Sequence, residues 1–397
     1  MRVLILTTPV PTHFQPLIPF GWALRAAGHD VLVAGQPDVL GTARSAGLSV
    51  ASAGDGFFVD DLLHEGLPPG VRPLSIRPRP PRDSLGSYGR LWMTHAKYLL
   101  PAYLRLARGY RPDLIVADPL EYASLLIGAV LGVPVAHHRW GVDEISEPAR
   151  AAVRPALAGV GARLGIGNLP DPTILLDPCP PSLQLPDAEP ATAMRYIPYN
   201  GRATVPDWRV AEVERGWRGG PGIRRVAVSM GGSLPVNGVR FVASVLGAFD
   251  AMPGVEVLAV VDERFRAELG AVPGNVRLID PTPLDLFLDS CDVLVHQGGA
   301  GTTMTATSYG VPQLVLPQLA YHFGHGDRIA ATGAGIAFDT AAEQDDRGLL
   351  RESLTSLLTD PAYRDAAHRL RAEMRATPAP DDVVTDLQER LVKDGVS

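Results

Sequence analysis

Apolar positions along the chain fall into short continuous runs that alternate with amphipathic stretches. In the first half, a strand expected at Arg2–Leu6, apolar from Val3 on, precedes a helical pattern at about Leu17–Ala27, and another apolar strand follows at Val31–Ala34. Gly28, between that helix and the next strand, suits the left-handed residue that often ends a helix. Continuous rather than alternating apolar strands are typical of parallel strands that helices cover on both faces. The pattern predicts a βαβ unit at the N-terminus.

The same alternation of strand and helix returns further along the chain. Leu114–Ala117 is predicted as a buried strand ending at Asp118, followed by a helix at about Tyr122–Leu131 and a strand at Val133–Ala136. The fold class is therefore α/β, with two doubly wound parallel-sheet domains facing each other across a cleft, where ligands bind at the strands' carboxyl ends. In the second half we expect strands at Val226–Met230, Val255–Val261, Val276–Ile279, Val293–His296 and Gln313–Leu316, and helices near Val239–Phe249, Leu284–Ser290 and Gly301–Tyr309.

Two proline-rich stretches interrupt this rhythm. Gly54–Gly89 is rich in proline and arginine and is predicted to be a long mobile loop, which is often where substrate specificity lies. Pro170–Pro206 is predicted to be the crossing between domains. We therefore expect an N-terminal domain at residues 1–205, a C-terminal domain at 220–380, and a last helix within 381–397. That helix presents Val384, Leu387 and Leu391 on one face.

Composition excludes several classes of protein. The 397 residues are 46% hydrophobic and 20% charged, as in a globular protein, and they suffice for two domains. A formal charge of −7 argues against general binding to nucleic acid or to an anionic membrane. The two cysteines lie far apart, and neither a signal peptide nor a membrane-length run is present, so we expect a cytoplasmic protein. A local basic stretch can still hold an anion: Arg72, Arg77, Arg79 and Arg82.

The stretch "VLVHQGGAGTTMTATSYGVP" joins a strand to a helix through glycines. Glycines at such a turn let the backbone approach an anion, and the free amides of the helix start donate to it. His296 before the glycines and the threonines after them add further donors. The spacing is neither G-x-G-x-x-G nor a Walker motif. It favours a diphosphate site, and the alternative is a tight turn that needs glycine for packing alone. The residues concerned are His296, Gly298, Gly299, Gly301, Thr302 and Thr303.

His13 and Asp118 follow two strands of the same predicted sheet, so they converge on one rim. A carboxylate that orients an imidazole can produce a general base near neutral pH, whereas the alternative for Asp118 is a helix N-cap. Trp140, in "AHHRWGVDE", can line an apolar acceptor pocket or pack in the core. The adjacent His137 and His138 would point in opposite directions on an extended chain, so they cannot bind one metal ion together. His322 and His325 have no further cluster of ligands near them in the sequence. We therefore expect no metal site.

Six motifs carry a resemblance to a known family. "PTH" after the first strand, "HRWGVD", "LDPCPPSLQ", "YIPYNG", "PLDLFL" and "GVPQLVLPQ" occur in the order and spacing seen in GT-B glycosyltransferases of antibiotic biosynthesis. The resemblance implies two facing Rossmann-like domains, with the acceptor in the first, the nucleotide-sugar donor in the second, and the last helix crossing back to the first.

The resemblance also assigns roles to residues. It implies catalysis by His13 as general base with Asp118 as its partner, by an inverting, metal-independent reaction without a cofactor. Donor binding would involve Gly231, Gly232, Ser233, Ile279, Pro281, Leu284, the diphosphate-loop residues above, Tyr321 and His322, and acceptor binding Thr12, Phe14, His138 and Trp140. The partners would be a dTDP-sugar and a hydrophobic polyketide-type aglycone, with neither nucleic acid nor membrane, in a possible homodimer.

One pair of residues departs from the family. After "LPQ", many relatives carry Asp-Gln, which holds sugar hydroxyls, and this chain has Tyr321 and His322. The replacements offer fewer acceptor sites, so we expect a deoxygenated sugar donor.

Three alternatives stay open beside oxygen glycosylation. They are a carbon–carbon glycosyltransferase, a nucleotide-sugar epimerase of the same fold, and a non-catalytic helper that binds nucleotide sugar. The sequence argues against a nicotinamide enzyme, because "TTPVPTHF" fills the turn after the first strand with prolines and bulky residues.

Overall fold

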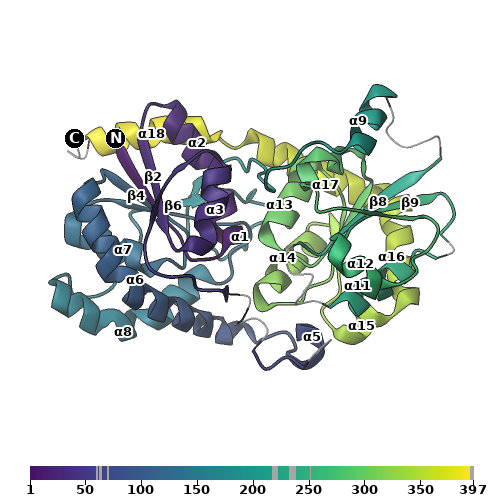
Figure 1. The fold of residues 1–397 in the computed structure, drawn as a ribbon, viewed down its shortest axis with the longest axis horizontal. Helices are drawn as coiled ribbons and strands as arrows, with labels where there is room; N and C mark the ends of the chain where they lie inside the picture. The colour runs from purple at the N-terminus through teal and green to yellow at the C-terminus, as the bar shows by residue number, and fades with distance from the viewer. Residues whose placement is uncertain are drawn as a thin grey trace. The chain divides into compact units, whose positions relative to one another are not determined.

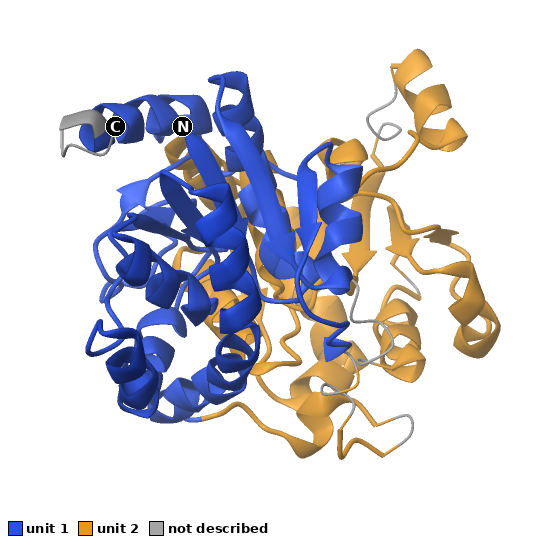
Figure 2. Cartoon of the chain, turned by 60° about the vertical axis from the view of Figure 1, so that its left-hand side comes forward, with its two compact units in different colours: residues 1–59, 81–201, 375–397 blue, residues 60–80, 202–374 orange. Residues whose placement is uncertain are grey.

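The computed structural model describes residues 1–59, 61, 65–68, 71–216, 222–231, 238–250 and 252–393. The chain divides into two compact units (Figure 2). Unit 1 comprises Met1–Val59, Pro81–Gly201 and Arg375–Ser397, and unit 2 comprises Asp60–Pro80 and Arg202–Met374. Each unit is built on a parallel sheet, which confirms the predicted α/β class with two parallel-sheet domains. Among the described helices, none is both long and apolar enough to cross a bilayer.

Unit 1 contains a seven-stranded sheet of order β3-β2-β1-β4-β5-β6-β7. Ile5 of the central strand β1 pairs in parallel register with Val33 on one side and Val116 on the other. Helices α2 and α3 lie against one face of the sheet, and α6 and α7 against the other (Figure 1). The strands are β1 (Arg2–Leu6), β2 (Asp30–Gly35), β3 (Ser49–Ser52), β4 (Leu114–Ala117), β5 (Val135–His138), β6 (Ile174–Asp177) and β7 (Thr192–Ala193). The helices are α1 (Pro11–Phe14), η1 (Gln15–Leu17), α2 (Ile18–Ala26), α3 (Pro37–Ser45), η2 (Arg82–Tyr88), α6 (Gly89–Tyr110), α7 (Tyr122–Leu131), α8 (Ser146–Leu164) and α18 (Pro380–Lys393).

The C-terminal helix α18 packs on α2 within unit 1 (Figure 1). Its side chains Val383, Val384, Leu387 and Leu391 are buried in the same core as Leu24 and other α2 residues. Burying one such side chain is worth about 1.5–3 kcal/mol, so this last helix contributes substantially to the stability of unit 1.

Unit 2 contains a six-stranded parallel sheet of order β10-β9-β8-β11-β12-β13. Its apolar core is formed by the sheet with α11 and α16, including Val228, Val245 and Leu354. The strands are β8 (Arg224–Ser229), β9 (Val255–Val260), β10 (Val276–Ile279), β11 (Val293–His296), β12 (Gln313–Val315) and β13 (Gly335–Ala337). The helices are α5 (Pro73–Ile76), α9 (Asp207–Glu214), α11 (Val239–Gly247), α12 (Glu263–Leu269), η4 (Leu284–Leu286), η5 (Leu288–Ser290), α13 (Ala300–Tyr309), α14 (Ala320–Ala331), α15 (Ala341–Asp345), α16 (Arg347–Thr359) and α17 (Pro361–Ala376).

Two expected elements differ in the structure. The strand expected at Val133–Ala136 starts later and runs on to His138, because Pro134 has no N–H to donate within a sheet. The helix expected at Leu284–Ser290 is two 3₁₀ turns, since Phe287 between them has φ −145°, which is not helical. Phe287 is fully buried, so packing of its ring accompanies the break.

The arginine-rich stretch predicted as a long mobile loop contains two short helical segments among its described residues, and its mobility stays a prediction. Residues 71–88 include α5 (Pro73–Ile76) and η2 (Arg82–Tyr88), while 60, 62–64, 69 and 70 lie outside the described residues. Each of these arginines contacts protein oxygens, and an anion at this stretch stays a prediction. Arg72 contacts Gln344, Ala341 and Asp345; Arg77 contacts the Glu65 carbonyl; Arg79 contacts Asp327 and Asp339; and Arg82 contacts Asp187.

Candidate active site

His13 lies on the one-turn helix α1, just after the end of β1. Its half-buried ring stacks on Trp140 with a centroid distance of 3.9 Å and lies 5.8 Å from the Trp92 ring. Burial lowers the pKa of His13 from 6.5 to about 3. The imidazole is therefore neutral at physiological pH, as a general base must be, but the expectation of a base with a near-neutral pKa is wrong, because burial makes this ring a weaker base.

Thr8 links His13 to Asp118. Its hydroxyl oxygen lies 2.7 Å from His13 Nδ1 and 3.0 Å from Asp118 Oδ2. A hydroxyl has one proton, so donation to the carboxylate leaves Thr8 to accept a hydrogen bond from the Nδ1–H of His13. This arrangement fixes the tautomer and leaves Nε2 unprotonated. Sequence reasoning expected Asp118 to act on His13 and missed Thr8, whose only signal was a hydroxyl at the end of β1.

Asp118 is fully buried at the end of β4. Burial raises its pKa, and four donated hydrogen bonds act in the opposite direction. Oδ2 accepts from the Thr8 amide and from the Thr7 and Thr8 hydroxyls, and Oδ1 accepts from the Leu120 amide. Four donors and no acceptor around one carboxyl favour its ionised form. The alternative role as N-cap of the next helix is wrong, because Glu121 caps α7 through the Ala123 amide.

The residues predicted to bind an acceptor occupy different depths. Thr12 is exposed, Phe14 is fully buried in the core of unit 1, and His138 is buried with Nδ1 2.5 Å from the Arg139 carbonyl. Trp140, by contrast, lies directly against His13. Sequence reasoning missed two further aromatic residues, Trp92 and Phe57, whose rings are 6.0 Å apart.

The motifs "HRWGVD" and "LDPCPPSLQ" hold the loop that carries Trp140. Arg139 donates to Asp143 at 2.9 Å and to Asp177 at 2.8 Å, and Gln184 donates to Asp177 at 2.9 Å. The adjacent histidines have separate partners, since His137 bonds to the Ser124 hydroxyl. The conspicuous polar residues of these motifs therefore fix backbone around the site.

In unit 2, His296 is fully buried where β11 enters the glycine-rich turn. Its Nδ1 accepts from the Gly298 amide at 3.0 Å, and its Nε2 lies 2.9 Å from Gln313 Oε1. Burial lowers the pKa of His296 to about 3, so the ring is neutral and donates through Nε2. Both nitrogens are thus engaged within the protein, and His296 shapes the turn instead of pointing a donor outward as expected.

The glycine-rich turn has a backbone that glycine alone adopts easily. Gly298 has φ +88°, and a Cβ there would lie 2.8 Å from the His322 carbonyl oxygen. Helix α13 then starts without a side-chain cap at Gly299, which leaves its first turn suited to an anion. Thr303 is buried and its hydroxyl donates to the Gly299 carbonyl, whereas Thr302 is half-buried at the helix start together with Gly301.

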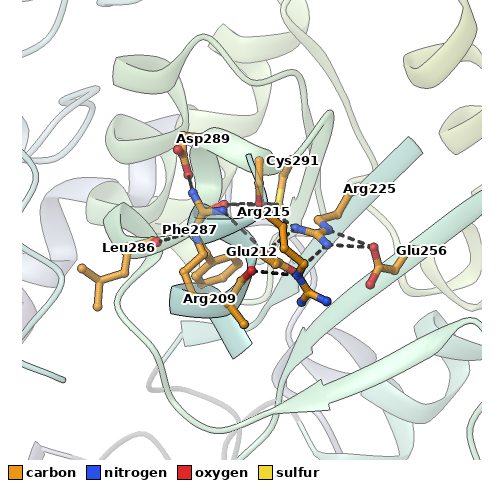
Figure 3. Close-up of polar contacts among 11 residues, drawn as sticks. Arg209, Glu212, Arg215, Arg225, Glu256, Leu286, Phe287, Asp289 and Cys291 are labelled. Atoms are coloured by element: carbon orange, nitrogen blue, oxygen red, sulfur yellow. Dashed lines mark hydrogen bonds and ion pairs between the residues drawn. The ribbon is translucent and has the colours of Figure 1, made fainter. Parts of the chain in front are cut away.

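A buried charge network holds the segment after β10 (Figure 3). Arg225 is almost fully buried and bonds to Glu212, Glu256 and Ser290. Arg209 of α9 donates to the Leu286 carbonyl at 3.1 Å and to Asp289 at 2.6 Å. These contacts fix the chain that follows the predicted donor residues, of which Ile279 and Leu284 are buried and Pro281 is exposed.

The glycine after β8 also makes a close approach. Gly231 has φ +58°, and a Cβ there would lie 2.7 Å from the Gln297 side-chain nitrogen, beside the glycine-rich turn. Gly232 and Ser233, the other predicted donor residues of this loop, lie outside the described residues.

Tyr321 and His322 occupy the first turn of α14. His322 is buried, and its Nδ1 accepts weakly from the Gln318 and Leu319 amides at 3.4 and 3.3 Å. Burial lowers its pKa to about 3. The half-buried Tyr321 ring contacts the His322 ring edge-on, with centroids 4.6 Å apart. Within the described residues, no group of three or more histidine, cysteine or acidic side chains could hold a metal ion.

Two doubly wound parallel-sheet units of this form define the GT-B class of glycosyltransferase, and solved structures agree. The spinosyn rhamnosyltransferase SpnG complexed with thymidine diphosphate is 34% identical, with a TM-score of 0.85, and the match covers 98% of this chain and 100% of that one. The chain belongs to the erythromycin biosynthesis protein CIII-like family, whose N-terminal domain matches residues 22–231 and whose C-terminal domain matches 241–390. This membership confirms the resemblance to antibiotic glycosyltransferases, and the chain is a glycosyltransferase.

Named relatives extend over almost the whole chain. L-demethylnoviosyl transferase from Streptomyces niveus is 35% identical, covering 98% of this chain and 97% of its own. Tylactone mycaminosyltransferase from Streptomyces fradiae is 34% identical, covering 98% and 92%.

Proposed function

We propose that the chain transfers a deoxysugar from a dTDP-sugar to a hydroxyl of a polyketide-type aglycone, with inversion at the anomeric carbon and without a metal ion or other cofactor. The observation that carries this proposal is the hydrogen-bonded series from Asp118 through Thr8 to His13, which leaves His13 Nε2 available as a base. Similar structures solved with thymidine diphosphate and with spinosyn aglycone support the two substrate classes.

The chemistry follows from the tautomer of His13. Nε2 takes the proton of the acceptor hydroxyl while its oxygen attacks the anomeric carbon from the face opposite the nucleotide. The carbon–oxygen bond to the diphosphate breaks, and dTDP leaves with that electron pair. Asp118 stabilises the resulting imidazolium through the Thr8 hydroxyl. A base of this kind contributes roughly 10²- to 10⁴-fold to the rate.

The leaving diphosphate gains negative charge during this step. In this proposal the uncapped amides at the start of α13 and its helix dipole stabilise that charge, and the close backbone approach at Gly298 suits a phosphate. In this proposal His296 acts indirectly, by holding the Gly298 amide in place. These fixed dipoles supply the stabilisation for which other enzymes use a cation.

Tyr321 and His322 support a deoxysugar donor. The structure engages His322 Nδ1 with backbone amides, so this ring offers a sugar no acceptor there. The phenol of Tyr321 and the imidazole of His322, whose Nδ1 is already hydrogen-bonded, stand where many relatives have a carboxylate and an amide. These two groups suit a sugar with fewer hydroxyl groups.

Aromatic side chains beside His13 support a broad apolar acceptor. Trp140 stacks on the imidazole, the Trp92 ring lies 5.8 Å from it, and the Phe57 ring stacks on Trp92. Flat rings bury large apolar areas at small cost in conformational entropy, as a polyketide surface requires.

The first test is calorimetric titration of the full chain with dTDP, UDP and NAD. We expect clear binding of dTDP, weaker binding of UDP and none of NAD, and stronger binding of UDP would contradict the donor class. Turnover should persist in EDTA and require an acceptor. Release of sugar from the nucleotide without an acceptor would favour an epimerase, and a carbon-linked product would favour carbon–carbon transfer. A failure to bind any of the three nucleotides would favour a helper protein.

A further inference from the structure

A segment from the first half of the sequence is anchored within unit 2. We call residues 71–80 the strap; they lie between β3 and α6 along the chain, yet they belong to unit 2. Arg72 is only 5% exposed. It donates to Gln344 at 2.6 Å, to the Ala341 carbonyl at 3.0 Å and to Asp345 at 2.8 Å. Its guanidinium lies 4.1 Å from the centre of the Phe241 ring, so the contact is both polar and stacked.

The other end of the strap is anchored to α14. Arg79 bonds to Asp327 on that helix and to Asp339 after β13, and its guanidinium lies 5.3 Å from the Phe323 ring centre. Phe323 immediately follows Tyr321 and His322. The strap therefore contacts the helix whose first turn carries the two residues that replace the family's sugar-binding pair.

Gln344 connects Arg72 to the loop before α14. Its amide group donates to the carbonyls of Pro317 at 3.0 Å and Phe338 at 2.7 Å. Its oxygen accepts from Arg72 and, at 2.6 Å, from Gln318. Gln344 is fully buried, so both of its donors and both of its acceptor positions are filled. Loss of Arg72 would remove one of the two acceptor contacts and free an amide that holds residues 317 and 318.

The buried side chain of Gln318 has an oxygen atom whose hydrogen-bonding capacity is not used by the described protein residues. Its side chain is 2% exposed, and within the described part of the chain its Oε1 has no hydrogen-bond partner. A buried amide oxygen without a partner costs free energy unless a water or a ligand supplies a donor. Sugar hydroxyls are such donors, and Gln318 lies three residues before Tyr321.

We propose that the strap positions the sugar-recognising part of the donor site. Arg72 holds Gln344 and thereby the path of residues 317–322, while Arg79 holds α14 from its outer side. Arg72 and Arg79 are positioning residues that touch neither nucleotide nor sugar. This inference rests on the proposed donor role of Tyr321 and His322. It implies that part of the stretch expected to carry substrate specificity sets how well the donor sugar is held.

The test compares variants at both ends of the strap with a control. Arg72→Met and Arg79→Met remove the anchors, and Arg82→Met serves as control because Arg82 pairs at the surface of unit 1 with Asp187. Binding of dTDP and of dTDP-L-rhamnose is measured by calorimetry, and backbone amide exchange is followed in peptides covering 316–326. Arg79 is exposed enough that its variant should fold even if the Arg72 variant does not.

We expect faster amide exchange at 316–322 in both anchor variants, by roughly fivefold, as loss of one hydrogen bond predicts. The dissociation constant of dTDP-L-rhamnose should rise about 10- to 100-fold while that of dTDP stays within twofold, since only the sugar end is displaced. The control should match the wild type. The conservative variant Arg79→Lys keeps a cation beside Asp327 and Asp339 and should lose less than Arg79→Met.

Unchanged exchange at 316–322 in the Arg79 variant would overturn the proposal. So would an equal loss of affinity for dTDP and for the dTDP-sugar, because that result indicates general damage. If the wild type bound no dTDP, the proposed function would fail, and the exchange experiment would still decide whether the strap holds this loop.

Discussion

Replacement of Thr8 by valine tests the link between His13 and Asp118. Valine has almost the shape of threonine and lacks the hydroxyl, so packing at the end of β1 is preserved. The Asp118 carboxylate keeps three donors, namely the Thr7 hydroxyl and the Thr8 and Leu120 amides. His13 Nδ1 loses the one hydrogen-bond partner recorded for it in the described chain. The substitution therefore removes a hydrogen bond of His13, while the buried Asp118 carboxylate keeps most of its hydrogen bonds.

The size of the effect follows from the charge on His13 during the reaction. A hydrogen bond to a charged group is worth about 1.5–3 kcal/mol, and each 1.36 kcal/mol is tenfold in rate. Because His13 is cationic only as the proton is transferred, we expect kcat to fall roughly 10- to 150-fold in Thr8→Val. Donor and acceptor KM should change little, and His13→Ala should lose more.

The assay is steady-state kinetics at saturating dTDP-sugar and aglycone, with product detected by mass spectrometry. Thr8→Ser retains a hydroxyl and should recover most of the activity. Thr7→Val removes a donor to Asp118 without touching His13, so its loss should be smaller. Nitrogen-15 spectra of the His13 ring should show protonated Nδ1 in the wild type and a mixture of tautomers in Thr8→Val.

One result would refute the reasoning directly. If Thr8→Val retained kcat within twofold while His13→Ala lost at least a hundredfold, His13 would act without help from the hydroxyl.

Three further predictions concern pH and the glycine-rich turn. Because burial lowers the pKa of His13 to about 3, kcat/KM should show no fall near pH 6.5 on acidification, and a fall there would contradict that environment. His296 has a pKa of about 3 in the folded protein and 6.5 when unfolded, so acidification below pH 6.5 destabilises the wild type. His296→Gln removes this titration. From pH 7.5 to pH 5 the unfolding free energy, measured by urea titration, should therefore fall by about 2 kcal/mol less in the variant than in the wild type. Gly298→Ala should weaken dTDP binding at least tenfold in calorimetry, because its Cβ would meet the His322 carbonyl, and unchanged affinity would remove the turn from the donor site.

The fold was predictable because its strands are continuous apolar runs with helix and turn signals between them. The run at Val293–His296 and its following glycines have the predicted positions in the structure. The ends of helices and strands were harder to predict where a proline or a buried ring determines them. Examples are Pro134 before β5 and Phe287 between η4 and η5. These effects depend on neighbours in space that a one-dimensional pattern does not contain.

Individual residues of the candidate site could be predicted from the sequence, but the hydrogen bonds that link them could not. His13 and Asp118 stood out as polar residues at strand ends, yet the hydroxyl between them comes from an unremarkable threonine. Arg72 looked like a candidate anion ligand because its partner Gln344 lies 272 residues away in sequence. His296 looked like an outward donor, and only the contacts of both ring nitrogens show that it serves the turn itself.

The packing of α18 on α2 makes unit 1 discontinuous in sequence, with most of unit 2 inserted before its last helix. A hybrid glycosyltransferase made by joining the first half of one family member to the second half of another would therefore place a foreign α18 against the native α2. The apolar face formed by Val383, Val384, Leu387 and Leu391 would then meet side chains that it was not selected to fit. Exchange of specificity between relatives requires a junction before α9 and another before α18, so that unit 1 keeps its own last helix, and the strap must come from the same parent as the unit 2 that it contacts.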